Sequence, residues 1–381
     1  MPKRACKFRF YPTDEQRVLL ARTFGCVRVV YNRVLRWRTD AFRDDGESIG
    51  YTGASARLTE LKKEPDFAWL REVSSVPLQQ CLRHQQRAFV NFFEGRAGYP
   101  SFKSKHRRQS AEFTRSAFKY RDGRLTLSKC STPLDVRWSR PLPSEPLTVT
   151  VSMDSAGRYF VSCLCEFEPV PLAPTAKRVG VDMGLTYLAI TSDGLKFDNP
   201  KHTARHAAAL AKAQRRLARK RKGSKNRAKA KRVVARRHAK IADARRDTLH
   251  KLTRRLIDEN QVVAVEHLNV AGMVKNRSLS KAIHDASWHE AVRQLKYKGE
   301  WAGRTVVVID RFFPSSRRCN GCGHVVAALP LDVRRWSCPE CGADHDRDVN
   351  AARNVLAAGL AVEACGESVS PAAGSGVGST R

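Results

Sequence analysis

The stretch VGVDMGLTYLAITSDG at residues 179–194 places a single carboxylate, Asp182, in a run of β-branched and apolar residues. Side chains alternate between the two faces of a strand, so Gly180 and Asp182 share one face and the neighbouring valines share the other. A glycine and then Ser-Asp-Gly permit tight turns, and the pattern predicts a β-hairpin. On its own, an aspartate at this position is best explained by hydrogen bonds to turn amides.

Two further acids favour a different role for Asp182. Glu266 ends a valine-rich run in QVVAVEHLN, and Asp346 and Asp348 open an alanine-rich helix in DHDRDVNAARNVL. Carboxylates brought from two strand ends and one helix start suit Mg²⁺ or Mn²⁺, which prefer oxygen ligands. Two such ions about 4 Å apart activate water and stabilise the leaving oxygen in phosphodiester hydrolysis. The three segments therefore predict a metal-dependent nuclease centre.

A formal net charge of +33 indicates the class of partner. Such an excess of lysine and arginine is typical of proteins that bind a polyanion, because neutralised phosphates release counterions. A membrane surface is the competing partner, but no apolar run approaches the roughly 20 residues that span a bilayer. The basic start MPKRACKFRFYP also lacks the apolar segment of a signal peptide. We therefore expect a cytoplasmic protein, associated with the prokaryotic nucleoid, that has no membrane partner.

Arginine and lysine dominate residues 205–255, which have helical propensity and are interrupted at Gly223. Two apolar stripes, the second of which includes Val233, predict that one side of each helix packs while the other faces stay cationic. We expect a helical hairpin over residues 203–259 that follows the phosphates of RNA or of an RNA–DNA heteroduplex. A solvated hairpin without a partner is disfavoured by self-repulsion. The arginines expected to contact nucleic acid are Arg215, Arg216, Arg219, Arg221, Arg236 and Arg237.

Four of the eleven cysteines form two CxxC pairs, and the others are scattered, so no disulfide framework is expected. The spacing C-x₂-C-x₁₅-C-x₂-C is close to that of a zinc ribbon, and four thiolates leave no open position, so the predicted zinc is structural. A redox dithiol is disfavoured because the pairs lack the helix N-terminus that lowers a thiol pKa. His324 and His345 are expected to stay outside the ligand set. The predicted zinc ligands are Cys319, Cys322, Cys338 and Cys341.

Alternation and helical periodicity predict the remaining elements. From Tyr99 onward the composition favours β-structure, which we expect to form a small barrel. The segment after Glu266 mixes Gly, Lys and Ser and is expected to be a loop, and periodicity is lost beyond Ala361. The predicted strands are 7–11, 113–120, 124–127, 147–153, 159–167 and 304–310, and the predicted helices are 12–35, 77–93 and one near 287–288.

Six motifs occur in a set order along most of the chain: FYPTDEQ, YNRVL, VGVDMGLTYLAITSDG, VEHLNV, FFPSSRRCNGCG and CPECGADHDRDVNAARN. In sequence and order they resemble the motifs of the TnpB family of transposon-encoded RNA-guided DNA endonucleases, which are relatives of the type V CRISPR effectors. The resemblance implies that Asp182, Glu266 and Asp348 are the catalytic acids of a RuvC-like nuclease and its Mg²⁺ (or Mn²⁺) ligands. Asp346 is then a neighbour without an assigned role.

The resemblance also implies a multidomain α+β fold. A β-barrel wedge domain carries an inserted helical recognition lobe, and an RNase H-like (RuvC) α/β nuclease domain with an inserted zinc ribbon follows. The implied boundaries are 1–12 and 100–170 for the wedge domain, 13–99 for the recognition lobe, 177–310 and 343–360 for the nuclease domain including the hairpin, 311–342 for the zinc ribbon and 361–381 for a flexible tail.

By the same resemblance, a transposon-derived guide RNA pairs with one strand of double-stranded DNA, which is cut beside a short motif. Tyr51 and Gln79 stand where the family places residues that contact this motif, and Val76 stands where an aromatic residue is expected. The segment after Glu266 corresponds to a lid over the nuclease centre. Two alternatives share parts of this chemistry: a non-cleaving RNA-guided DNA-binding protein, and a transposase or recombinase that acts on transposon ends.

Overall fold

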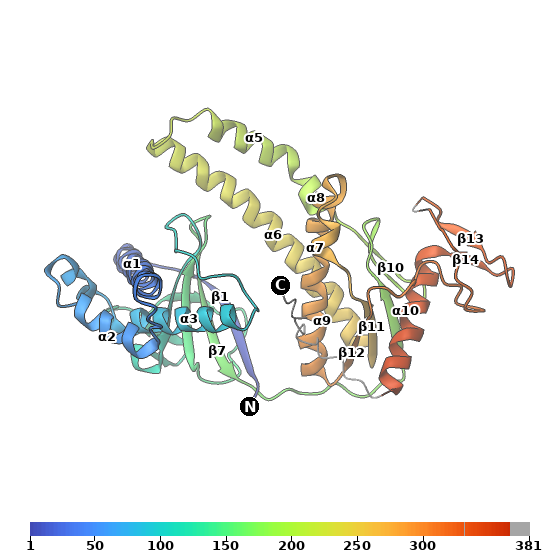
Figure 1. Cartoon of the computed structure of the whole chain (residues 1–381), viewed down its shortest axis with the longest axis horizontal. Helices are drawn as coiled ribbons and strands as arrows, with labels where there is room; N and C mark the ends of the chain where they lie inside the picture. Colours follow the sequence, from blue (N-terminus) through green and yellow to red (C-terminus); the bar gives the residue numbers. More distant parts are fainter. Residues whose placement is uncertain (331, 366–381) are drawn as a thin grey trace. The chain divides into compact units, whose positions relative to one another are not determined.

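The computed structural model describes residues 1–330 and 332–365. The chain divides into two compact units: Met1–Glu168 with Arg221–Arg236, and Pro169–Lys220 with Arg237–Arg381. Each unit contains a five-stranded sheet, and helices make up much of the rest of the chain (Figure 1). The protein therefore has the mixed α and β content that the sequence predicted.

The first unit is built on an antiparallel sheet in the order β2-β6-β7-β1-β5, with a separate hairpin of β3 and β4. The predicted strand 113–120 was wrong in one respect, because a 3₁₀ turn at Arg115–Ala117 divides it between the sheet and the hairpin. In the described chain no ladder joins the edge strands β2 and β5, so an open sheet replaces the single closed barrel we expected. The strands are β1 (Lys3–Tyr11), β2 (Gln109–Thr114), β3 (Phe118–Arg121), β4 (Arg124–Leu127), β5 (Asp135–Arg137), β6 (Thr148–Met153) and β7 (Tyr159–Glu166).

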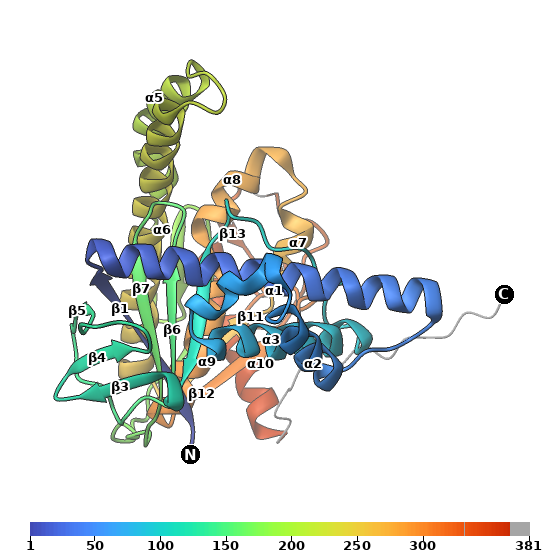
Figure 2. The ribbon, with the colours of Figure 1, turned by 90° about the vertical axis from the view of Figure 1, so that its left-hand side faces the viewer.

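One long helix, α1 (Asp14–Asp45), runs across this sheet (Figure 2). Its start is fixed by a capping box, in which the Thr13 side chain accepts from the Gln16 amide and the Gln16 side chain accepts from the Thr13 amide, each at 3.2 Å. Its apolar stripe packs with the inner face of the sheet in one core, as the periodicity predicted. The other helices of this unit are α2 (Tyr51–Leu61), the 3₁₀ helix η1 (Pro65–Glu72) and α3 (Ser75–Phe93).

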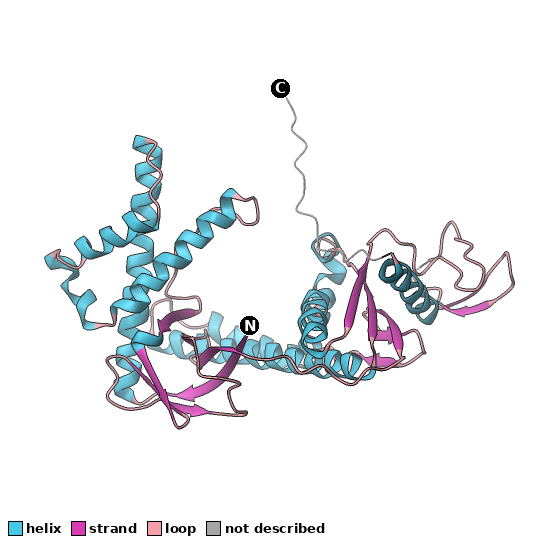
Figure 3. Cartoon of the chain, turned by 90° about the horizontal axis from the view of Figure 1, so that it is seen from below, coloured by secondary structure: helices cyan, strands magenta, loops and turns pink. Residues whose placement is uncertain are grey.

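The second unit has a sheet in the order β10-β9-β8-β11-β12, in which β8, β11 and β12 are parallel. One face is covered by side chains of α6 and α9, and the other by α10, so the sheet lies between helices (Figure 3). Val181 is the register partner of Val265, which puts the next residues, Asp182 and Glu266, at adjacent strand ends. The strands are β8 (Arg178–Asp182), β9 (Tyr187–Thr191), β10 (Lys196–Asp198), β11 (Val262–Glu266) and β12 (Thr305–Ile309).

The two basic helices α5 and α6 form as predicted, and Gly223 between them has a positive φ of 83°. Val233 was wrongly assigned to the packed stripe, since 46% of it is exposed, whereas Ile241 and Leu249 farther along α6 are buried. The helices of this region and of the second unit are α4 (His202–Arg205), α5 (Ala207–Ala218), α6 (Lys225–Glu259), α7 (Val270–Met273), α8 (Arg277–Ala286), α9 (Trp288–Ala302) and α10 (Arg347–Ala364).

Two sequence expectations are corrected at helices of the second unit. The segment after Glu266 is largely helical rather than a loop, because Asn269 and Asn276 cap α7 and α8 and Ile283 anchors α8 in the core. The expected tail from residue 361 begins later, since α10 continues to Ala364. Residues 366–381 of that expected tail lie outside the described residues.

Gly180 permits the close approach of α10 to β8. A Cβ atom added there would lie 2.1 Å from the Ala352 carbonyl oxygen and 2.6 Å from the Leu356 amide nitrogen. We expect Gly180→Val to destabilise the protein by roughly 3 kcal/mol or more, because backbone rather than a flexible side chain must move. Thermal denaturation measures this loss.

The matched control is Gly25→Ala, since a Cβ at Gly25 meets nothing within 4 Å. This variant should unfold at or above the temperature of the parent protein, because alanine is the better helix former. A Gly180→Val protein as stable as the parent would show that α10 does not pack against β8 as described.

Candidate active site

Asp182 ends β8 on the side of the sheet that faces α10, the side that it shares with Gly180. Burial raises the pKa of its carboxyl group and the nearby carboxylates of Asp348 and Glu266 add to the rise, so that the pKa is about 7. The guanidinium groups of Arg347 and Arg334 oppose this rise without cancelling it. The structure thus brings the three predicted acids into one electrostatic group, from β8, β11 and α10.

Glu266 occupies the neighbouring strand end. Burial raises the pKa of its carboxyl group, while a hydrogen bond from the Ser315 hydroxyl to Oε2, at 3.4 Å, acts against that rise. Ser315 is itself buried, and its carbonyl oxygen accepts a 2.8 Å hydrogen bond from the Asn354 side chain of α10. Sequence reasoning missed Ser315, whose only signal was its place in the FFPSS motif.

Asp346 and Asp348 have different roles at the start of α10. Asp346 is the N-cap: its Oδ1 accepts from the Asp348 and Val349 amides, both at 3.1 Å, and its Oδ2 accepts from Lys196 Nζ at 2.9 Å. Burial would raise the pKa of Asp346, but the bonds from Lys196 and Val349 hold it below its ordinary value. Asp348 instead accepts from Arg334 Nη1 at 3.2 Å and 3.4 Å. The cap therefore positions the first turn from which Asp348 projects.

The donor set of this acidic group fits a hard divalent cation. Three carboxylates from three elements repel one another at Asp182, and a cation would relieve that repulsion. A second group of candidate ligands, the four ribbon cysteines, has its ligand atoms within 4.8 Å of one another.

The raised pKa of Asp182 predicts a pH-dependent stability cost in metal-free protein. The folded-state pKa of about 7 lies above the ordinary value of 3.8. The free energy of unfolding therefore decreases as pH rises through this interval. Asp182→Asn removes the titrating group. We expect it to raise the melting temperature at pH values above the folded pKa by a few °C, with a difference that shrinks toward about pH 4.

Thermal denaturation in chelator across this pH range measures the effect. Asp198→Asn, at an exposed position of the same sheet, is the control and should leave the pH profile unchanged. An Asp182→Asn protein that is less stable than the parent at every pH would mean that Asp182 makes net favourable contacts in the absence of metal.

The four predicted zinc ligands also come together. The sulfur of Cys319 lies 3.7 Å from that of Cys341, and the sulfur of Cys322 lies 3.6 Å from that of Cys338. Each CxxC turn closes on a glycine with positive φ, 82° at Gly323 and 68° at Gly342. A tetrahedral metal that binds four thiolates fits this cluster.

His345 stands against this cysteine cluster, with Nε2 3.1 Å from the Cys319 sulfur and its ring packed on Trp336. Burial raises the pKa of the Cys319 thiol, but amide hydrogen bonds from Cys322 and Gly321 outweigh it and bring the value to about 7. Cys319 is thus readily deprotonated, as a zinc ligand must be. The strands β13 (Arg335–Ser337) and β14 (Asp344–Asp346) lead from the cluster to α10.

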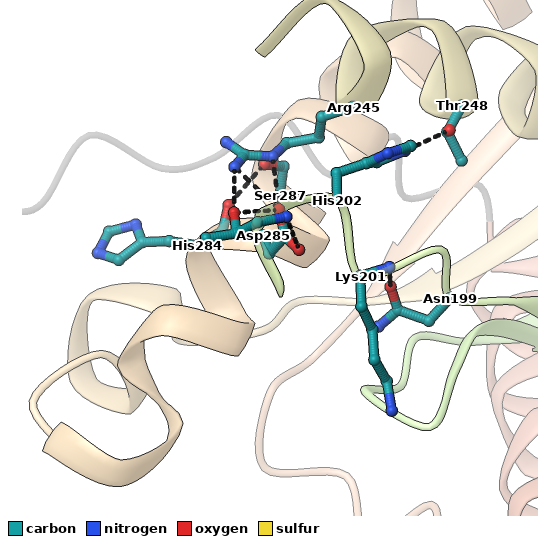
Figure 4. A network of polar contacts seen from close by, with 9 residues as sticks. Asn199, Lys201, His202, Arg245, Thr248, His284, Asp285 and Ser287 are labelled. Atoms are coloured by element: carbon teal, nitrogen blue, oxygen red, sulfur yellow. Dashed lines mark hydrogen bonds and ion pairs between the residues drawn. The ribbon is translucent and has the colours of Figure 1, made fainter. Parts of the chain in front are cut away.

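A polar network holds the base of the basic hairpin to the segment after Glu266 (Figure 4). Asp285 of α8 accepts from the Thr203 amide at 2.9 Å, from the Thr203 hydroxyl at 2.7 Å and from Arg245 of α6 at 3.0 Å. His202 contacts Thr248 of α6 at 2.8 Å. Sequence reasoning missed Asp285, a nearly buried acid whose partners are distant in the chain. The network fixes α8 to α6.

The arginines predicted to contact nucleic acid are all exposed. No acidic residue occurs between Asp198 and Asp243, so no acid within this part of the chain offsets its positive charge. Arg245, by contrast, is paired with Asp285. The exposed set is Arg215, Arg216, Arg219, Arg221, Arg236 and Arg237.

Tyr51 and Gln79 lie together in the first unit. The Tyr51 hydroxyl and the Ser55 hydroxyl each donate to Gln79 Oε1 at 3.1 Å. The Arg83 guanidinium lies over the Tyr51 ring, 4.6 Å from its centroid. The two residues predicted to contact DNA therefore form one half-buried polar cluster with a cation beside it.

None of the helices in the described residues combines the length and the apolarity that a membrane crossing requires.

Three family models match the chain. Residues 143–277 match the IS605 OrfB model, described as "Probable transposase", residues 288–355 match "Cas12f1-like, TNB domain", and residues 1–47 match "Helix-turn-helix domain". The last description does not fit the structure, since residues 1–47 form strand β1 and the single helix α1. The TNB model spans the cysteine cluster and the first half of α10.

Full-length relatives and a solved structure extend these matches. A protein of Streptomyces pristinaespiralis named "Putative RNA-guided DNA endonuclease" is 58% identical, covering 97% of this chain and 92% of that protein. A protein of Escherichia coli K12 named "Putative RNA-guided DNA endonuclease InsQ" is 34% identical. The match covers 96% of this chain and 94% of that protein. Cas12f1, in a cryo-EM complex with sgRNA and target DNA, shares the fold with a TM-score of 0.56 at 13% identity. The match covers 93% of this chain and 98% of the Cas12f1 chain. The chain belongs to the TnpB family, the OrfB proteins of IS605-type transposons.

Proposed function

We propose that this protein is an RNA-guided DNA endonuclease that cuts double-stranded DNA beside a short motif. The observation that carries the proposal is the convergence of Asp182, Glu266 and Asp348 on the face of the sheet that α10 covers. The relatives that match nearly the whole chain carry this activity in their names, and the solved Cas12f1 structure holds a guide RNA and target DNA. The second unit is on this proposal a RuvC-like nuclease domain.

The proposed cofactor of this centre is Mg²⁺ or Mn²⁺, held by the three carboxylates. When bound, it would supply an activated water and a Lewis acid at the phosphodiester. Ser315 orients Glu266 through its hydrogen bond, and Asp346 caps α10 so that Asp348 projects toward Asp182. Arg334 donates to Asp348 and offsets its negative charge.

The remaining parts of the chain serve substrate binding on this proposal. The first unit supplies a wedge domain (1–12 and 100–170) and a recognition lobe (13–99), with Tyr51 and Gln79 at the motif beside the target. The exposed arginines of the basic hairpin bind backbone phosphates of a transposon-derived guide RNA or its heteroduplex. The cysteines of residues 311–342 hold a structural Zn²⁺. Such an enzyme would act on DNA at the nucleoid.

Cleavage of a plasmid library by the purified ribonucleoprotein tests the proposal. The protein is expressed with its transposon end, the RNA that co-purifies is sequenced, and plasmids that match its guide are incubated with Mg²⁺. The proposal predicts double-strand breaks beside one short motif. Binding without nicks would favour a non-cleaving RNA-guided protein, and joined strands would favour a recombinase.

Neutralising the arginines of α5 should weaken RNA binding through charge alone. We expect the triple variant Arg215→Gln, Arg216→Gln and Arg219→Gln to lower the slope of log K against log salt concentration by about one per lost phosphate contact. The measurement is guide-RNA affinity over a series of salt concentrations.

The control triple variant changes Arg246, Arg254 and Arg255 to glutamine. Each of these arginines is already paired with an acid of α6, at 3.7 Å, 2.6 Å and 2.9 Å respectively. Its salt slope should stay near that of the parent. Equal slopes for the parent and the α5 variant would show that the hairpin is not part of the RNA-binding surface.

A further inference from the structure

A cavity of about 400 Å³ opens in the first unit between α1, α3 and the loop that leads into β2. Its floor is apolar and buried, formed by Phe24, Val27 and the ring of Tyr31. Four cationic side chains line it, and among the described residues that line it there is no acid. The cations are Arg28, Lys103, Arg107 and Arg108.

The backbone of this loop is fixed in place by side chains. Asn32 of α1 accepts from the Lys103 amide at 2.8 Å and donates to the Lys103 carbonyl at 3.0 Å. Gln109 donates to the carbonyls of Ser104 and Arg107, at 3.0 Å and 2.7 Å, and accepts from Arg28 at 3.2 Å. The backbone that carries Lys103 and Arg107 is therefore held in position before any ligand arrives, and so is the Arg28 side chain.

Two aromatic rings stand at the cavity with large exposed surfaces, 48% for Tyr99 and 53% for Phe102. Tyr99 is oriented by edge contacts with Phe89 and Phe92 and by a 2.7 Å hydrogen bond to the Thr39 hydroxyl. Exposed aromatic rings held in one orientation lose little entropy when a planar ligand stacks on them.

We propose that this cavity binds one unpaired nucleotide, with its base against Phe102 or Tyr99 and its phosphate among the four cations. A volume of about 400 Å³ lies in the range of sites for small ligands. A base within a duplex hides both faces in the stack, so the nucleotide must be unpaired. The inference rests on the proposed function for its ligand, a nucleotide of the guide RNA or of the displaced or target DNA.

Photo-crosslinking in the assembled ribonucleoprotein tests this inference and identifies the source. One arm carries 4-thiouridine in the guide RNA, and the other carries 5-iododeoxyuridine in the DNA strands. We expect an adduct on the peptide spanning residues 98–110 in one of the two arms. Phe102→Ala should reduce its yield about tenfold, since stacking on an aromatic side chain contributes most of the contact with the base.

Phe42→Ala is the matched control, because Phe42 is an exposed aromatic of α1, 62% accessible, outside the cavity lining. It should leave the adduct yield unchanged. Adducts on α5 or α6 but none on residues 98–110 in either arm would overturn the inference and leave the proposed function intact. A protein that assembles with neither guide RNA nor target DNA would instead overturn the proposed function.

Discussion

Asp182→Ala is expected to lower the rate of DNA cleavage at least about a thousandfold, which corresponds to a loss of about 4 kcal/mol of transition-state stabilisation. The side chain lies among the carboxylates of Glu266 and Asp348, so its removal takes away a shared ligand of the proposed metal centre. Guide RNA and target DNA should bind nearly as before, because the variant removes no lysine or arginine side chain. Single-turnover cleavage and filter binding measure the two quantities separately.

Asp198→Asn provides the control for this prediction, since Asp198 is an exposed acid in β10 of the same sheet. Its cleavage rate should match that of the parent protein. Cleavage that survives Asp182→Ala would show that the phosphodiester is hydrolysed elsewhere on the protein, and the proposed catalytic group would be wrong.

Loss of the ribbon cysteines is expected to disable the nuclease indirectly. The Cys319–Asn320 turn is tied to α10, because Asn350 and Asn354 donate to the Arg318 carbonyl at 2.7 Å and 2.6 Å and Asn320 donates to Asn350 at 3.0 Å. Cys338→Ser with Cys341→Ser should release zinc and loosen the first turns of α10. Misplacement of Asp348 by about 1 Å would lower cleavage about a hundredfold.

Metal analysis and cleavage assays on the same samples check this prediction. Cys365→Ser is the matched control, an exposed cysteine outside the cluster, and should keep both zinc and activity. A double variant that loses zinc but cuts DNA at the parental rate would show that the ribbon does not position Asp348.

The strand motifs were the part of this fold that sequence analysis could predict best. Alternation along residues 179–182 is a local property, and it correctly placed Gly180 and Asp182 on one face. The pairing of Val181 with Val265 is a long-range property, because many registers satisfy two valine-rich runs equally well. The sequence therefore indicated which acids to consider, and the sheet register brought them together.

Errors arose where composition and tertiary contacts point in different directions. The Gly, Lys and Ser content after Glu266 suggested a loop, but asparagine caps and the buried Ile283 stabilise helices there. Asp285 had no sequence signal and Ser315 only its place in the FFPSS motif, because their partners are more than 30 residues away. The sequence left Asp346 without an assigned role, and the structure shows that it caps α10.

Diffraction from Mn²⁺-soaked crystals of the ribonucleoprotein, recorded at the manganese absorption edge, tests the central claim most directly. The account predicts an anomalous peak in contact with the carboxylates of Asp182, Glu266 and Asp348, and its loss in Asp182→Ala. Manganese bound only elsewhere, in crystals whose protein cuts DNA in solution, would contradict it.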